Sequence, residues 1–135
     1  MSATPYIAKT ILNPRDAIAS HVRWKITLLL ATRMREQLSQ RAIDAIHHPD
    51  ECSIGKWLLS KHALHLRATP EFRAVVELHL ASHDHMRQVA ALIRAGAFEQ
   101  AECTLNAQEP FLSTSNAFAN ALMALDRLPP AKPAN

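Results

Sequence analysis

The sequence predicts an all-α fold, specifically an antiparallel four-helix bundle with an additional short helix. Only two glycines occur among the 135 residues, and 48% of the chain is apolar. Asn-Gly turns and alternating β-branched runs, which are typical of strands, are missing. Broad apolar stripes at helical spacing alternate with short connecting segments, and this alternation is typical of helical bundles.

The first helix is expected to begin at Asn13 and Pro14 and to extend to about Leu38. Asn13 can cap free backbone N–H groups, and Pro14 suits the first helical position. One apolar stripe comprises Ala17, His21, Trp24, Leu28, Ala31 and Leu38. A second stripe comprises Ile18, Val22, Ile26 and Leu29. Because the two stripes cover a wide arc, this helix is expected to contact more than one neighbour, and a second subunit is one candidate.

Two shorter helices are expected next. A short helical piece is predicted around residues 42–46, before the break at Pro49. Asp50 is then a candidate N-cap for a short helix over residues 51–62.

The next long helix has clear signals at both ends. Thr69 can cap it, Pro70 suits its first turn, and Glu71 complements the positive end of the helix dipole. Gly96 is expected to end it after about residue 95. Its inward stripe comprises Phe72, Val75, Val76, His79, His83, Met86, Val89 or Ala90, and Ile93.

The C-terminal part is expected to contain two further helical stretches and a tail. A helix after Gly96 is predicted to be interrupted near Pro110, and a final helix is predicted over residues 112–128. We therefore expect one domain over residues 1–128 and a Pro-rich tail or linker over residues 129–135.

Composition narrows the classes of function. No segment reaches the roughly 18 apolar residues that span a bilayer, and no signal peptide is visible, so no membrane partner is expected. Two distant cysteines do not make a disulfide framework, which favours a reducing cytoplasm. The net charge is +3, but the cations are scattered and mixed with acids, which argues against a nucleic-acid partner.

Several histidines occupy positions where core residues are expected. His79 and His83 are four residues apart, so both rings lie on the inward stripe of one helix. His21 lies on the inward stripe of the first helix. Buried imidazole nitrogens need polar partners. Cys52 adds a thiol near a helix N-terminus, which is expected to lower its pKa.

Three imidazoles and one thiolate would complete a tetrahedral zinc site. Such a site would tie three helices together from ligands dispersed along the chain, as in metal sites inside bundles. The alternative is a histidine pair on a partly wet helix face, with Cys52 an inert buried residue. The residues alone leave both interpretations open.

Three motifs carry a resemblance to a known family. They are His21 with Trp24 in "HVRWK", Cys52 in "CSIGKWL", and His79 with His83 in "HLASH". In this order, and with a Cys-x-x-Gly-x-Trp context, they resemble the signature of the chemoreceptor zinc-binding domain. The set of motifs is specific, whereas His-x-x-x-His by itself is a weak signal.

The resemblance covers about residues 10–128 and implies that His21, Cys52, His79 and His83 bind one zinc ion. It also implies a helical bundle that forms homodimers. Family members act as cytoplasmic sensory modules on bacterial chemoreceptors and diguanylate cyclases. In some of them the zinc-bound cysteine looks like a sensor of hypochlorous acid. This chain departs from the common arrangement because no methyl-accepting region and no cyclase domain are visible in it, so we expect it either to act through a separate partner or to be one domain of a larger protein.

Other residues are assigned structural roles. Trp24 is expected to shield the site, and Gly55 and Trp57 are expected to give close packing and anchorage in the core. His62 and His65 could bind a second metal, although exposure to solvent is the simpler expectation. The remaining expectations are solvated side chains for His47 and His48 and a small core residue at Cys103.

The sequence therefore predicts a zinc-responsive sensory or regulatory domain and not an enzyme, because four protein ligands close a tetrahedral zinc. Its partners would be a second copy and a signalling protein such as a chemoreceptor or a diguanylate cyclase. Two alternatives stay open. One is a structural zinc scaffold for protein docking, and the other is a zinc hydrolase in which Cys52 is a nucleophile or a dissociable ligand.

Overall fold

A computed structural model describes residues 13–106 and 113–128 of the chain. Over these residues it contains helices and no strand, so the all-α prediction is confirmed there. The helices are α2 (Pro14–Met34), α3 (Gln40–His47), α4 (Ser53–Leu59), the 3₁₀-helix η1 (Lys61–Leu66), α5 (Pro70–Arg94), α6 (Phe98–Asn106) and α7 (Ser113–Asp126). The predicted interruption at Pro110 and the tail over residues 129–135 lie outside the described residues.

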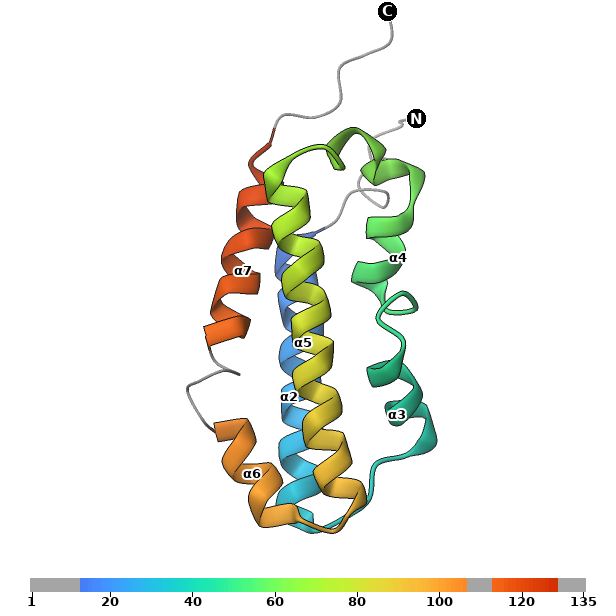
Figure 1. Ribbon diagram of the computed structural model, residues 1–135, viewed down its shortest axis with the longest axis vertical. Helices are drawn as coiled ribbons and strands as arrows, with labels where there is room; N and C mark the ends of the chain where they lie inside the picture. Colours follow the sequence, from blue (N-terminus) through green and yellow to red (C-terminus); the bar gives the residue numbers. More distant parts are fainter. Residues whose placement is uncertain (1–12, 107–112, 129–135) are drawn as a thin grey trace, which may run out of the picture.

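The two long helices, α2 and α5, lie in the middle of the molecule and run in the same direction (Figure 1). The chain returns along one side through α3 and α4, and along the other side through α6 and α7 (Figure 1). Helix α5 contacts α2, α3, α6 and α7 and is therefore the central element. None of the described helices is both long enough and apolar enough to cross a bilayer.

The predicted starts of the two long helices are confirmed. The Asn13 side chain accepts hydrogen bonds from the backbone N–H groups of Arg15 and Asp16 at 2.9 and 3.3 Å. The Thr69 hydroxyl accepts one from Phe72 N–H at 3.2 Å. Each cap satisfies donors that the first helical turn leaves without an intrahelical partner.

Three predicted helix boundaries were wrong. Helix α2 ends at Met34 and not near Leu38, because Arg35 takes up the left-handed conformation (φ 54°, ψ 45°) and stops the helix. The N-cap of α4 is Cys52 and not Asp50, and α4 ends at Leu59. The chain from Lys61 onward is a 3₁₀-helix, so the predicted helix over residues 51–62 is two short elements.

The core consists of two apolar clusters, one at each end of the molecule. The upper core, near α4 and α7 in Figure 1, comprises Ala17, Ile54, Leu58, Ala63, Leu66, Phe72, Val75, Phe118, Leu122 and Leu125. The lower core, near α3 and α6, comprises Leu28, Ile46, Met86, Val89, Ala90, Ile93, Ala101 and Leu105. Along α5, Val75 belongs to the upper core and Met86 to the lower core. The buried side chains of His79 and His83 lie between them in the sequence of the helix.

Candidate metal centre

Helix α5 brings two histidines into the interior. His79 is 3% exposed and His83 is 1% exposed, and their ring centroids are 4.7 Å apart. The four-residue spacing places the rings on one helix face, one turn apart. The predicted inward orientation of both histidines is therefore confirmed.

Helix α2 contributes the third imidazole. The His21 ring centroid lies 5.5 Å from the ring centroids of both His79 and His83. Its Nδ1 lies 3.1 Å from the Ser82 hydroxyl oxygen. The Phe118 ring packs against the same group, with its centroid 5.1 Å from that of His21 and 5.9 Å from that of His79. A hydrogen bond at one nitrogen fixes the ring orientation and leaves the other nitrogen available.

Cys52 enters the site from the start of α4. Its Sγ lies 3.0 Å from His79 Nε2 and accepts a hydrogen bond from Gly55 N–H at 3.4 Å. The same sulfur lies 3.3 Å from the Pro49 carbonyl oxygen. The thiol therefore acts as the N-cap of α4, and the capping geometry points it toward the histidines.

Gly55 makes this turn possible. A Cβ atom at that position would lie 1.9 Å from the Pro49 carbonyl oxygen, far inside van der Waals contact. Only glycine lets the chain before Cys52 fold back so closely on the first turn of α4. This close approach gives a physical reason for a glycine three residues after the cysteine.

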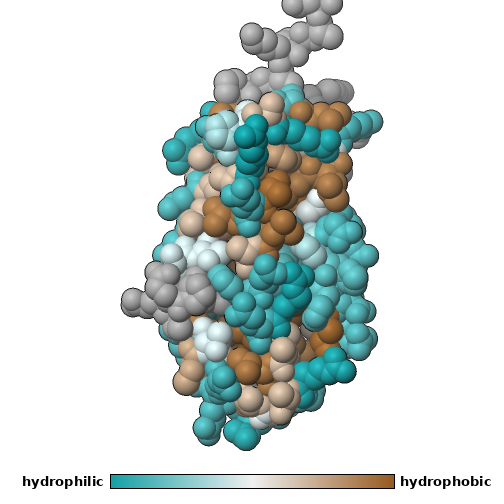
Figure 2. Space-filling model, viewed as in Figure 1, coloured by the Kyte–Doolittle hydropathy of each residue, from teal (hydrophilic) through white to brown (hydrophobic). Residues whose placement is uncertain are grey.

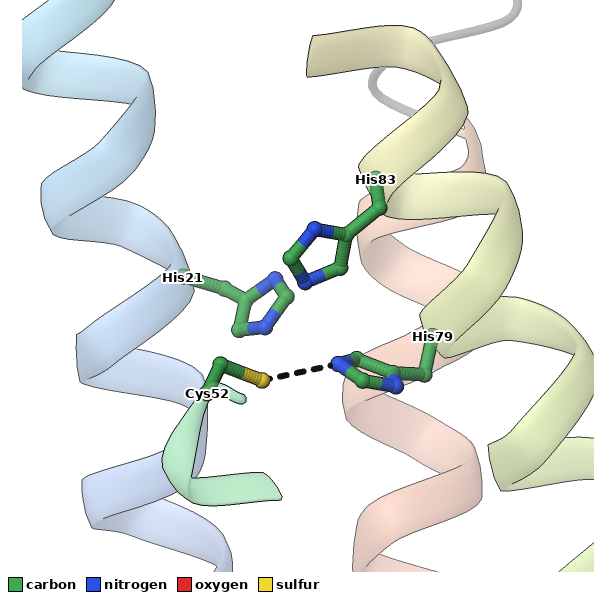
Figure 3. A group of neighbouring side chains, drawn as sticks. All are labelled: His21, Cys52, His79 and His83. Atoms are coloured by element: carbon green, nitrogen blue, oxygen red, sulfur yellow. Dashed lines mark hydrogen bonds between the residues drawn. The ribbon is translucent and has the colours of Figure 1, made fainter. Parts of the chain in front are cut away.

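The four side chains converge on one space. Their candidate ligand atoms all lie within 4.8 Å of one another, and Figure 3 shows the three rings and the sulfur directed toward a common centre. His83 Nδ1 lies 2.9 Å from the Ile46 carbonyl oxygen, whereas His83 Nε2 is buried with no hydrogen-bond partner. A bound cation would supply the partner that this nitrogen lacks.

The chemistry of the donors fits a borderline-soft divalent metal. Nitrogen from imidazole and sulfur from cysteine are the ligand atoms that structural zinc sites use, with four ligands in a tetrahedron. The residues that would hold such an ion are His21, Cys52, His79 and His83, which are the four that the sequence singled out. The arrangement is thus a candidate metal centre between the upper and lower cores.

Burial controls the protonation of the site. Burial is the larger cause and neighbouring imidazoles the smaller one, and together they lower the pKa of His21 to about 3 and that of His79 to about 4. Burial also lowers the pKa of His83. All three rings are therefore neutral at pH 7, which is the form that binds metals.

The expected depression of the Cys52 pKa was wrong for the metal-free site. Burial raises the pKa of the Cys52 thiol and outweighs the backbone hydrogen bonds at the start of α4, which lower it. The free thiol is therefore protonated at pH 7. A metal ion would have to displace this proton before the sulfur could bind.

The other singled-out residues lie around the centre or away from it. Trp24 is partly buried and packs against the lower core, and Trp57 is partly buried and packs against the upper core. Cys103 is exposed, so its prediction as a core residue was wrong. The histidines at 47, 48, 62 and 65 are all exposed, as the solvent interpretation predicted.

Sequence reasoning missed two neighbours of the site, Ser82 and Phe118. Ser82 precedes His83 on α5, and its spacing from His79 gave no sign that it would contact α2. Phe118 was identified only as an apolar residue of the final helix. Their contacts with His21 depend on how α2, α5 and α7 pack together, which no local pattern contains.

Comparisons with known proteins found no family model, no curated protein and no solved structure that matches this chain. The family resemblance therefore depends on the quoted motifs alone. The geometry of the four residues is an independent observation, because it concerns where the side chains lie and not which motifs they form.

Proposed function

We propose that this protein is a zinc-binding sensory or regulatory domain of the chemoreceptor zinc-binding type, holding one zinc with His21, Cys52, His79 and His83. One observation carries the proposal: the four ligand atoms lie within 4.8 Å of one another, and two of the four residues are buried. The buried and unpartnered Nε2 of His83 supports it further. The motif resemblance supports the sensory role and the cytoplasmic location.

The donor set favours a binding role over catalysis. Three imidazoles and one thiolate fill the four positions of a tetrahedral zinc, whereas hydrolytic zinc keeps one position for water. The site lies between two apolar cores, and His79 and His83 are almost fully buried. We therefore assign no hydrolytic activity to it.

A switch follows from where the four ligands are attached. His21, His79 and His83 belong to the two long central helices, whereas Cys52 belongs to the turn before the seven-residue helix α4. Bound zinc would join this turn to α2 and α5. Loss of the ion, or oxidation of the Cys52 sulfur, would remove that link and free the start of α4. The signal would then pass to a partner such as a chemoreceptor or a diguanylate cyclase.

An exposed apolar row on α2 supports the proposal of a homodimer. Val22, Ile26, Leu30 and Met34 recur every four residues, and each is about half exposed. Such a row lies along one side of a helix and can pack against a second helix. We expect sedimentation equilibrium to detect a dimer that an Ile26→Glu variant abolishes. If this variant still dimerises, the dimer interface lies elsewhere on the protein.

The structural-scaffold alternative is also favoured by one observation. The site lies beside both apolar cores, and without a metal the buried His83 Nε2 has no hydrogen-bond partner. Circular dichroism after chelation separates the two proposals. Retained helicity favours a switch, and cooperative loss of helicity favours a structural metal.

Metal analysis of the purified protein tests zinc binding directly. We expect one zinc per chain in the natural protein and in a Cys103→Ala variant, because Cys103 is exposed and lies outside the cluster. A Cys52→Ala variant is expected to lose most of its zinc. Equal zinc content in the two variants would show that the Cys52 thiolate is not a ligand.

A further inference from the structure

The segment that follows Cys52 presents an unusual exposed surface. We define the α4–η1 surface by its exposed side chains: Lys56, Leu59, Lys61, His62, Leu64, His65 and Arg67. Leu59 is 67% exposed and Leu64 is 56% exposed, although both are large apolar residues. Figure 2 shows hydrophobic atoms gathered at the upper right, over α4 and η1. A contiguous exposed apolar patch with a polar rim marks an interaction site, whereas single exposed apolar residues do not.

The charge of this surface has one sign. The sequence contains no Asp or Glu from Cys52 through Pro70, whereas Lys56, Lys61 and Arg67 are cationic. The stretch over residues 17–35 likewise contains no acid, but Arg33 in that stretch is already paired with Glu102. An acidic partner would therefore meet no like charge from the chain segment that forms this surface.

Buried residues support the α4–η1 surface on its inner side. Ile54, Leu58, Ala63 and Leu66 are buried in the upper core, so α4 and η1 are anchored along their inner side. The Arg67 guanidinium donates hydrogen bonds to the carbonyl oxygens of Leu58 and Ser60 at 3.4 and 3.3 Å. These bonds link η1 to the end of α4. They therefore help to fix the position of Leu64 relative to Leu59.

We propose that the α4–η1 surface docks an acidic, partly apolar helical segment of a partner protein. Carboxylates of that segment would pair with Lys56, Lys61 and Arg67, and its apolar side chains would cover Leu59 and Leu64. The proposal names the chemistry of the partner and, in its link to zinc, rests on the proposed function.

The link to the metal centre passes through Cys52. This residue is the N-cap of α4 and one of the four clustered donors, so a ligand on the sulfur acts directly on the first turn of α4. With Cys52 held by zinc, the surface is pre-organised, and docking is expected to be tighter. By thermodynamic reciprocity, the docked segment raises zinc affinity by the same factor.

The probe is a fluorescein-labelled synthetic helical peptide of glutamate and leucine, followed by fluorescence anisotropy. A peptide of lysine and leucine with the same pattern is the control ligand. We expect the acidic peptide to bind preferentially, and a Lys61→Glu/Leu64→Ser variant to bind it at least about tenfold more weakly. A Leu80→Ser variant is the matched protein control, because Leu80 is 46% exposed but lies on α5.

Three outcomes would overturn the docking proposal. They are equal binding of the two peptides, an equal loss of binding in the Leu80→Ser variant, and binding to anionic phosphatidylglycerol vesicles in place of the acidic peptide. Zinc content is measured on the same samples. If the protein binds zinc but not the peptide, only the docking proposal is wrong. If it binds the peptide but not zinc, the proposed function is wrong and the docking surface is still supported.

Discussion

Two pairs of histidines are close in the sequence and lie in opposite environments. His79 and His83 are four residues apart on an α-helix, almost fully buried, and near a third imidazole and a thiol. His62 and His65 are three residues apart on a 3₁₀-helix, where that spacing also aligns side chains, and both are exposed. Spacing alone therefore does not distinguish them. The difference lies in burial and in the donors that other helices bring to the buried pair.

The largest expected effect comes from removing one buried ring. In a His83→Leu variant the leucine fills the space but supplies no nitrogen, so zinc affinity should fall by more than about 100-fold. The reason is that losing even an outer partner of a ligand costs about 10–100-fold. Competition with a chromophoric zinc chelator measures the change, and circular dichroism checks the fold.

The exposed pair supplies the control for that experiment. A His62→Ala/His65→Ala double variant should bind zinc as tightly as the natural protein, because neither side chain belongs to the buried cluster. A similar loss of affinity in both variants would contradict the distinction between the two pairs.

Acid should destabilise the metal-free protein through the buried rings. The pKa values of His21 and His79 are lowered to about 3 and about 4 in the folded state, below the ordinary value of 6.5. Between these values and pH 6.5 the unfolded chain binds more protons, so the free energy of unfolding rises with pH and falls on acidification. Each ring contributes at most about 1.4 kcal/mol per pH unit.

Urea unfolding at pH 7, 6 and 5 measures this dependence without zinc. A His79→Leu variant should show a weaker dependence on pH than the natural protein. The prediction fails if stability is constant from pH 7 to pH 5, or if the His79→Leu variant keeps the full dependence.

The Cys52 turn should be sensitive to a single methyl group. A Gly55→Ala variant would place a Cβ atom against the Pro49 carbonyl oxygen, and relieving that overlap is expected to cost about 1–3 kcal/mol of stability. Zinc affinity should fall as well, since the turn carries the sulfur ligand. Thermal unfolding and zinc competition measure the two effects.

Gly96 provides the matched control for Gly55. A Cβ there would meet nothing within 4 Å, but its φ of 77° strains any other residue, so Gly96→Ala should lower stability. Zinc affinity should not change in that variant, because Gly96 lies beyond the end of α5. If zinc affinity fell equally in both variants, a general loss of stability would explain the result, and the close approach at Gly55 would have no specific effect on the metal site.

Local signals in the sequence predicted much of the fold. Asn13 and Thr69 mark helix starts through contacts within three residues, and both caps are present. The inward positions of His79 and His83 follow from helical periodicity, which is also local. The end of α2 was not predictable, because the left-handed conformation at Arg35 has no signature such as glycine.

Tertiary packing explains what the sequence did not predict at the site. A position near a helix start indicates a low pKa for Cys52, but burial, which depends on three packed helices, raises it. Cys103 resembled a core residue in its local sequence and is exposed. The four donors could be named from motifs, whereas their common centre between the two cores required the packed structure.

The smallest expected effect concerns Ser82, a neighbour of the buried group. Its hydroxyl lies 3.1 Å from His21 Nδ1 and orients that ring toward the other donors. A Ser82→Ala variant should lower zinc affinity by roughly tenfold, the lower end of the range for outer partners of metal ligands. Ser82→Thr keeps the hydroxyl and should restore most of the affinity, and Ser115→Ala on α7 should change nothing. Unchanged affinity in Ser82→Ala would mean that packing against Phe118 and the neighbouring imidazoles is enough to orient His21.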